Sequence, residues 1–298
     1  MNRKGLILVI GKIGQVGWEL RRTLAPLRPL VVVDYPDIDL TDANSIRRWV
    51  RKTGPSAIVN AAAYTTVDKA ETELDRCMAI NGAAPGILAE EAKKAGALLV
   101  HYSTDYVFDG TKESPYTEED EPNPLSAYGR SKLAGDRAIL AAGPDHLIFR
   151  LCWVYGARGQ NFMLTMMRLA REREKLRVVQ DQVGCPTWSR MIAEATAMAL
   201  QQALATEPGR FQGVYHLAAA GHTNWHAFAQ AIIDRLPAET KKCSVIEPIT
   251  TADYPLPARR PARSILGCDK LERVFGLKLP HWEESLQLAL NEAGVMTP

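Results

Sequence analysis

The stretch LILVIGKIGQVGWEL, residues 6–20, decides the fold. It opens with an unbroken apolar run, typical of a strand buried on both faces of a parallel sheet, and Gly11, Gly14 and Gly17 follow directly. Glycines in this spacing allow a tight turn, let backbone N–H groups approach a pyrophosphate and let the next helix pack closely on the strand. The stretch therefore predicts the opening of a dinucleotide-binding unit, although the three glycines alone also fit an ordinary tight turn.

Short apolar runs alternate with longer helical patterns through the first half of the chain. This alternation is typical of βαβ units, in which helices cover both faces of a parallel sheet. It predicts an α/β fold: a Rossmann-type doubly wound parallel sheet with a smaller C-terminal substrate-binding lobe. The expected strands are Leu6–Ile10, Val31–Asp34, Ala57–Asn60, Leu98–Tyr102 and Leu147–Trp153.

The rhythm changes after about residue 157, where helical patterns and Gly/Pro-rich stretches dominate. We expect residues 1–157 to form a dinucleotide-binding domain and residues 158–298 to form mainly a substrate-binding lobe. The two are expected to interleave, because residues 189–218 contain a helix and a strand that can return to the main sheet. The elements expected here are helices at Asn161–Glu174, Arg190–Leu204 and Asn224–Arg235 and a strand at Val214–Leu217.

The composition favours a small-molecule partner. Hydrophobic residues make up 46% of the 298 positions and charged residues 23%, and the formal net charge is +2. This balance gives no field of one sign that would attract nucleic acid or a membrane surface, and no apolar run approaches the ~20 residues of a membrane helix. The five cysteines are scattered singly, which indicates reduced thiols rather than a disulfide framework and predicts a cytoplasmic protein.

Two further segments extend the predicted dinucleotide site. Asp34 lies about twenty residues after the glycine turn, where a carboxylate can bind the adenosine ribose and repel a 2′-phosphate, which favours NAD over NADP. Arg28 or another mobile cation would soften that preference, and Asp34 also fits a turn-capping role. Asp39 and Leu40 can flank the adenine or form an ordinary turn. The small residues of 60–63 (Asn-Ala-Ala-Ala) can let the cofactor lie against the backbone or simply pack against a helix.

A second constellation carries acid–base chemistry. Tyr128 and Lys132 are four residues apart in a predicted helix and so share one face, and Thr104 follows the strand 98–102. A phenol of pKa ~10 is a poor acid at neutral pH, and a neighbouring ammonium lowers that pKa. A Tyr-x-x-x-Lys pair alone is usually a solvated helix face, but its order behind the glycine turn and Thr104 makes it specific.

These motifs together resemble the extended short-chain dehydrogenase/reductases. From end to end, the chain is similar to the dTDP-4-dehydrorhamnose reductase family within them. That similarity is carried by residues 59–71 (VNAAAYTTVDKAE), 101–110 (HYSTDYVFDG), 128–135 (YGRSKLAG), 149–155 (FRLCWVY), 181–187 (DQVGCPT) and 259–263 (RRPAR).

The resemblance implies reduction of the C4 ketone of dTDP-6-deoxy-L-lyxo-4-hexulose to dTDP-L-rhamnose, with NADPH or NADH as cofactor. It implies that Tyr128, Lys132 and Thr104 are catalytic, and that Thr104, Asp105, Tyr128 and Trp153 bind the dTDP-sugar. Arg260 can contact the diphosphate, since a guanidinium fork suits phosphate oxygens, or can be an ordinary surface arginine. The implied cofactor contacts are Gly11, Gly14, Gln15, Val16, Gly17, Asp34, Asp39, Leu40, Ala62, Ala63, Tyr64, Thr65, Tyr128 and Lys132.

Other activities of the same fold stay open to different degrees. A dehydratase needs an acidic pair after the Thr, whereas Tyr106 follows Asp105 here, so simple reduction is the more economical chemistry. An epimerase keeps Thr, Tyr and Lys and is not excluded by them. A different class, a non-catalytic regulatory subunit of a methionine adenosyltransferase, is disfavoured because all three catalytic residues are retained.

Metal and dimer contacts are less defined. The resemblance makes Mg²⁺ possible, but no carboxylate cluster can be assigned to it, and Gln15 and Arg190 stand where acidic ligands would be expected by analogy. His222 and His226 have the spacing of a zinc pair without a third ligand, so no metal site is predicted. The apolar stripe of the final helical segment, Trp282, Leu286 and Leu290, either packs against this chain or supports a homodimer.

Overall fold

The computed structural model describes residues 5–295 and contains a six-stranded parallel sheet, which confirms the predicted fold class. The strand order β2-β1-β3-β4-β5-β10 reverses direction at β1, so the gap between β1 and β3 is the switch point at which such sheets bind ligands. The six strands are β1 (Ile7–Ile10), β2 (Leu30–Val33), β3 (Ala57–Asn60), β4 (Leu98–Thr104), β5 (His146–Leu151) and β10 (Gly213–His216).

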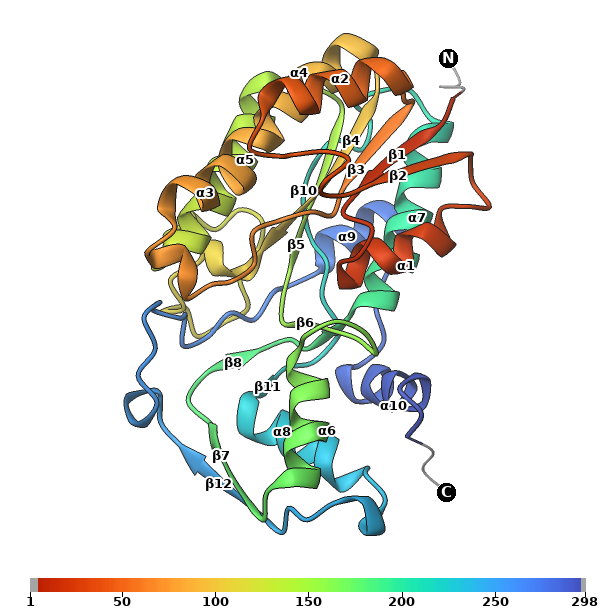
Figure 1. The fold of residues 1–298 in the computed structure, drawn as a ribbon. Helices are drawn as coiled ribbons and strands as arrows, with labels where there is room; N and C mark the ends of the chain where they lie inside the picture. Colours follow the sequence, from red (N-terminus) through yellow and green to blue (C-terminus); the bar gives the residue numbers. More distant parts are fainter. Residues whose placement is uncertain (1–4, 296–298) are drawn as a thin grey trace.

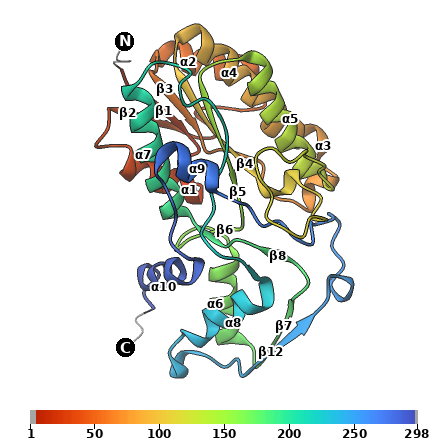
Figure 2. The same ribbon diagram turned by 180° about the vertical axis from the view of Figure 1, so that it is seen from behind.

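Helices cover both faces of this sheet (Figures 1 and 2). Successive residues of β1 point to opposite faces: Ile7 and Val9 enter one core and Leu8 and Ile10 the other. The first core is completed by α1 (Gln15–Thr23), α7 (Ser189–Ala205) and α9 (Asp269–Phe275), and the second by α2 (Ala43–Thr53), α4 (Ala84–Ala95) and α5 (Ala127–Ala142).

The second lobe has its own core beyond the carboxyl-terminal edge of the sheet (Figure 1). That core packs α6 (Phe162–Glu172), α8 (Trp225–Asp234) and α10 (Trp282–Glu292) against a pair of parallel strands, β7 (Lys175–Val179) and β12 (Val245–Ile249). The remaining elements are β6 (Val154–Tyr155), β8 (Val183–Gly184), β9 (Thr187–Trp188), β11 (Thr223–Asn224), α3 (Leu74–Met78), the 3-10 turns η1 (Lys69–Glu71), η3 (Asp105–Val107), η4 (Ala238–Thr240) and η5 (Thr251–Asp253), and a π-turn η2 (Ala79–Ala83).

The chain crosses back from the second lobe to the sheet. Helix α7 lies in the same core as α1, and β10 adds to the sheet edge by pairing with β5. Domain limits at 1–157 and 158–298, with about 189–218 returning, stay a proposal.

The structure shortens one predicted strand and decides between the two roles open to the final apolar stripe. Strand β5 was expected to reach Trp153 but ends at Leu151, because Trp153 has a φ of 44° in the left-handed region and breaks the extended backbone. The stripe of Trp282, Leu286 and Leu290 is buried in the second-lobe core, so it packs against this chain. Within residues 5–295 no helix has the length and apolarity needed to cross a bilayer.

Candidate active site

The glycine turn lies at the end of β1, next to the switch point. Gly11 has a φ of 101°, and a Cβ there would lie 2.7 Å from the backbone nitrogen of Ala62. A Cβ on Gly17 would lie 1.6 Å from the Gly11 carbonyl oxygen, so only glycine lets α1 start this close to the strand. Helix α1 begins at Gln15, and its N-cap residue Gly14 has no side chain to cap it, which leaves the first N–H groups of the helix available to an anion. These features fit a pyrophosphate.

The two aspartates predicted for the adenosine end are engaged by backbone amides. Asp34 accepts from the N–H of Ile13 at 3.1 Å and from that of Tyr35 at 2.8 Å, so its carboxylate braces the glycine turn. Asp39 accepts from the backbone and hydroxyl of Thr41, and these hydrogen bonds lower its pKa. Both residues therefore have a structural role that does not depend on a cofactor.

The segment after β3 lies beside the predicted catalytic tyrosine. The backbone of Tyr64 bonds in both directions to the Asn81 side chain, at 2.8 and 2.9 Å, which fixes the segment on η2. The Tyr64 and Tyr128 rings pack on one small apolar cluster with Ala70 and Cys77. Of the predicted nicotinamide contacts, Ala62, Ala63 and Tyr64 are partly buried and Thr65 is exposed.

Tyr128 stands in the first turn of α5, as the sequence predicts. Ser126 caps this helix by accepting from the N–H of Gly129 at 3.1 Å. The hydroxyls of Tyr128 and Thr104 share a hydrogen bond, and the Tyr106 ring meets the Tyr128 ring edge-on at 5.7 Å. The fold therefore brings Thr104 from the end of β4 to the phenol of α5.

The pKa of Tyr128 departs from the expectation. The predicted effect of Lys132 was to lower it, but burial raises it well above its usual value, and the hydrogen bond to Thr104 offsets this only in part. The Lys132 ammonium is engaged elsewhere: it donates to the Tyr102 carbonyl at 2.6 Å and meets His101 Nε2 at 3.2 Å. Burial also lowers the pKa of Lys132 to about 8.

Asp105 is buried beneath Thr104 rather than open to solvent. Its Oδ1 accepts from the Thr104 hydroxyl at 3.1 Å, and its Oδ2 accepts from the Cys152 thiol at 3.2 Å. Burial raises its pKa to about 6, and hydrogen bonds from Ser264, Cys152 and Thr104 oppose that rise. Asp105 therefore holds the Thr104 hydroxyl in place beside Tyr128.

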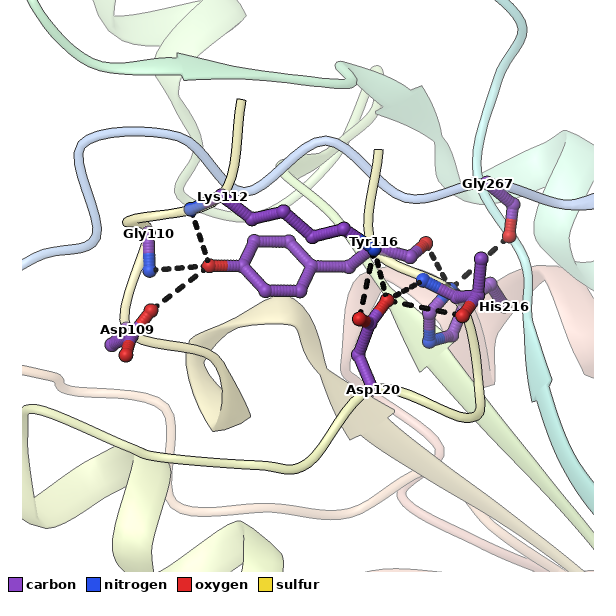
Figure 3. A network of polar contacts seen from close by, with 8 residues as sticks. Asp109, Gly110, Lys112, Tyr116, Asp120, His216 and Gly267 are labelled. Atoms are coloured by element: carbon purple, nitrogen blue, oxygen red, sulfur yellow. Dashed lines mark hydrogen bonds and ion pairs between the residues drawn. The ribbon is translucent and has the colours of Figure 1, made fainter. Parts of the chain in front are cut away.

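The loop that follows Asp105 is anchored through Tyr116 (Figure 3). The Tyr116 hydroxyl donates to Asp109 Oδ1 at 2.9 Å and accepts from the N–H of Gly110 at 3.0 Å. At its other end, the Tyr116 carbonyl accepts from the N–H of Gly267 at 2.7 Å and from His216 Nδ1 at 3.1 Å. The loop between β4 and α5 is thus fixed to β10 through His216 and to the segment just before α9 through Gly267.

Trp153 faces the second lobe. Its indole stacks on Trp225 with ring centres 3.5 Å apart and an interplanar angle of 6°. A Cβ on Gly184 would lie 2.5 Å from the Trp153 ring, so that glycine leaves room for the stack. Trp225 of α8 therefore determines where the predicted sugar-contacting indole lies.

Arg260 reaches the rim of the same site from the C-terminal part of the chain. Its guanidinium makes a forked pair with Asp68, at 3.1 and 2.8 Å, and bonds to the Tyr106 hydroxyl. Tyr106 in turn contacts Tyr128. Arg260 is thus a half-buried, paired residue rather than an ordinary surface arginine.

The residues present do not fit Mg²⁺. The Arg190 guanidinium lies 3.1 Å from Glu292 Oε1 and 3.5 Å from Glu19 Oε2, where its positive charge repels a divalent cation. Gln15 accepts a hydrogen bond from Asn161 at 2.9 Å. No group of three potential His, Cys, Asp or Glu ligands occurs in residues 5–295.

The family model described as the RmlD substrate binding domain matches residues 5–295. The chain belongs to that family. A dTDP-4-dehydrorhamnose reductase of Burkholderia thailandensis is 49% identical over 292 residues, which cover 96% of this chain and 98% of the relative. A crystal structure of a dTDP-4-dehydrorhamnose reductase from Clostridium acetobutylicum superimposes with a TM-score of 0.90 at 35% identity, covering 97% of this chain and 99% of the other. The Bacillus anthracis enzyme in complex with NADP has a TM-score of 0.88 at 33% identity, with the same coverage.

Sequence reasoning missed the residues that hold the predicted site residues in place. Asp68 lies inside the quoted segment 59–71, and His101 opens the segment 101–110, so both lay in informative motifs without a role. Trp225 and Ser264 carried no signal in the pattern, because their contacts with Trp153 and Asp105 exist only in the fold.

Proposed function

We propose that this protein reduces the C4 ketone of dTDP-6-deoxy-L-lyxo-4-hexulose, also called dTDP-4-dehydrorhamnose, with NADPH or NADH to give dTDP-L-rhamnose. This is the last step of dTDP-rhamnose biosynthesis. The observation that carries the proposal is the convergence of Tyr128 and Thr104 at the end of β4, with buried Lys132 one helical turn away. That arrangement occurs in a chain whose curated relative from Burkholderia thailandensis is named for this reaction.

The nicotinamide, when bound, supplies the hydride. The protein's own groups handle the oxygen: Tyr128 holds a proton that it gives to the C4 oxygen, and Thr104 orients that oxygen. Because burial raises the pKa of Tyr128, the phenol carries this proton at neutral pH, and carbonyl reduction consumes that form. Lys132 would bind the nicotinamide ribose and hold it beside the phenol.

The glycine turn and the start of α1 hold the pyrophosphate, with Gln15 and Val16 in the first turn. Asp34, Asp39 and Leu40 form the adenosine end, and Ala62, Ala63, Tyr64 and Thr65 line the nicotinamide half. Trp153 and Arg260 lie on the sugar-nucleotide side, where Asp68 holds the Arg260 fork in place before a diphosphate arrives. The contribution of Asp105 is to hold Thr104.

The test is a steady-state assay of NADPH and NADH oxidation with the keto sugar nucleotide, and dTDP-glucose, which has no ketone, as the control. We expect turnover with the keto sugar alone and dTDP-L-rhamnose as the product. An epimerase would interconvert sugars without net oxidation of NAD(P)H, and a regulatory subunit would bind the dinucleotide without turnover. Either result would reject the proposal. Homodimer formation and a cytoplasmic location stay predictions.

A further inference from the structure

The Lys132 ammonium is held by two acceptors of the protein itself. An ammonium has three donor hydrogens. One is directed at the Tyr102 carbonyl, 2.6 Å away, and a second at His101 Nε2, 3.2 Å away. The Lys132 side chain is 2% exposed, so its orientation is set by these neighbours rather than by water. The third hydrogen is therefore the one that can reach a bound ribose or the Tyr128 oxygen.

The chemical state of His101 follows from its surroundings. Burial, with a smaller contribution from the Lys132 charge, holds the pKa of His101 well below its ordinary value, so the ring is neutral. A neutral imidazole has one donor and one acceptor nitrogen. Because Nε2 faces an ammonium, Nε2 is the acceptor, and the ring hydrogen is on Nδ1.

Asn60 completes the chain on the other side of the ring. Its side-chain nitrogen Nδ2 is placed 3.2 Å from His101 Nδ1. With hydrogen on Nδ1, a hydrogen bond to the ring requires the amide to be rotated by 180° so that Oδ1 faces Nδ1, an exchange that preserves the shape of the side chain. The Lys132 ammonium thus sets the tautomer of His101, and Asn60 lies at the other ring nitrogen, where its rotated amide accepts from Nδ1–H.

We propose that His101, flanked by Asn60 at its Nδ1, is a positioning residue for Lys132: its Nε2 takes one ammonium hydrogen, the Tyr102 carbonyl takes a second, and the free hydrogen is thereby aimed at the nicotinamide ribose and Tyr128. This inference rests on the proposed function, because it assigns Lys132 to that site. It extends the predicted Thr104, Tyr128 and Lys132 set by two buried residues of the neighbouring strands β3 and β4.

The groups around Lys132 determine what loss of His101 does to its proton. His101 faces it from β4, Cys77 from α3, and Asp136 from the next turn of α5. Asp136 raises the pKa of Lys132 against the effect of burial and is itself paired with Arg150 of β5 at 3.6 Å. A hydrogen bond to the ammonium favours the charged form, so an apolar residue at position 101 lowers the pKa of Lys132 further.

The experiment compares His101→Leu with His101→Gln. Glutamine can place Oε1 where the ring has Nε2, and it keeps the acceptor, whereas leucine removes it at similar volume. His146→Leu is the matched control, because His146 is a buried histidine at the start of the neighbouring strand β5 whose Nδ1 lies 2.9 Å from the Pro144 carbonyl oxygen. The readouts are kcat, KM for the sugar, the pH profile of kcat, the dissociation constant of NADPH from fluorescence, and the midpoint of thermal unfolding.

We expect His101→Leu to lower kcat about tenfold or more and to weaken NADPH binding several-fold, with KM for the sugar little changed. Its alkaline limb should move to lower pH by about one unit. His101→Gln should lie within about threefold of wild type in each readout, and His146→Leu should affect stability alone. Wild-type kinetics and NADPH affinity in His101→Leu, or equal losses in His101→Gln and His146→Leu, would overturn the assignment.

Failure of the proposed function is a separate result. If the wild-type protein binds NADPH without reducing the keto sugar, the reductase proposal fails, while the NADPH titrations of the leucine and glutamine variants still decide the role of His101. If wild type turns over and the leucine variant behaves identically in both assays, the His101 inference fails by itself.

Discussion

Replacement of Tyr128 by phenylalanine removes one hydroxyl group and leaves the packing of the ring intact. The ring keeps its edge contact with Tyr106 and its place in the small cluster with Tyr64 and Cys77. The structural loss is the hydrogen bond with Thr104, which contributes roughly 0.5–1.5 kcal/mol to stability. The variant should therefore fold, with a thermal midpoint within a few degrees of wild type.

The catalytic loss should be much larger than the structural one. A positioned general acid contributes typically about 10²–10⁴ to a rate, equivalent to roughly 3–5.5 kcal/mol of transition-state stabilisation. We expect Tyr128→Phe to lower kcat within that range while both KM values change by less than about threefold. The measurement is steady-state NADPH oxidation with the keto sugar nucleotide, with enzyme concentration raised to detect slow turnover.

Tyr106→Phe is the control for this experiment. It removes the same atom from the neighbouring buried ring, whose hydroxyl bonds to Arg260. If that arginine meets the substrate diphosphate, Tyr106→Phe changes KM for the sugar nucleotide and leaves kcat within a few-fold of wild type. A Tyr128→Phe variant within tenfold of the wild-type kcat, or a Tyr106→Phe variant with an equal loss of kcat, would refute Tyr128 as the acid.

Two further predictions concern charge. Because Arg190 lies between Glu19 and Glu292, chelation with EDTA should change neither kcat nor the thermal midpoint. A decrease in kcat or in the thermal midpoint on chelation would show that the protein binds a metal. The hydrogen bond from Arg51 lowers the pKa of Glu91 to about 2 in the folded protein, from about 4.5 in the unfolded chain. The stability that Glu91 contributes is therefore fully present above about pH 4.5 and is lost as the pH falls toward 2. Urea unfolding should show Glu91→Gln destabilised by ~1–2 kcal/mol at pH 7 and equal to wild type near pH 2; a difference independent of pH would contradict the assignment.

The fold was predictable because its signals are local. A parallel strand buried on both faces needs an apolar run, and Ala57–Asn60 was predicted with the bounds that β3 has. Helix α7 was placed within one residue at each end, since its apolar residues recur with helical spacing over many turns. Strand β5 was predicted too long, because nothing in the pattern marks the left-handed backbone of Trp153.

The site was predictable as a set of residues and less so as a set of contacts. Motif order placed Thr104 and Tyr128 together, and the hydrogen bond between them is consistent with that. The partners that hold the set are distant in sequence: Arg260 and Asp68 are separated by 192 residues, and His101 and Lys132 by 31. Such pairs have no periodic signature and depend on which loops the fold brings to one edge of the sheet.

The pKa of Tyr128 shows why spacing alone misjudges electrostatics. Four residues on a helix place Lys132 near the phenol, and the sequence therefore favours a lowered pKa. In the fold, burial raises the pKa of the phenol and lowers the pKa of the ammonium. His101 and the Tyr102 carbonyl also take two of the three ammonium hydrogens. The phenol thus stays protonated in the free protein. That state serves a reduction, which consumes the phenol proton, better than an oxidation, which needs the phenolate as base.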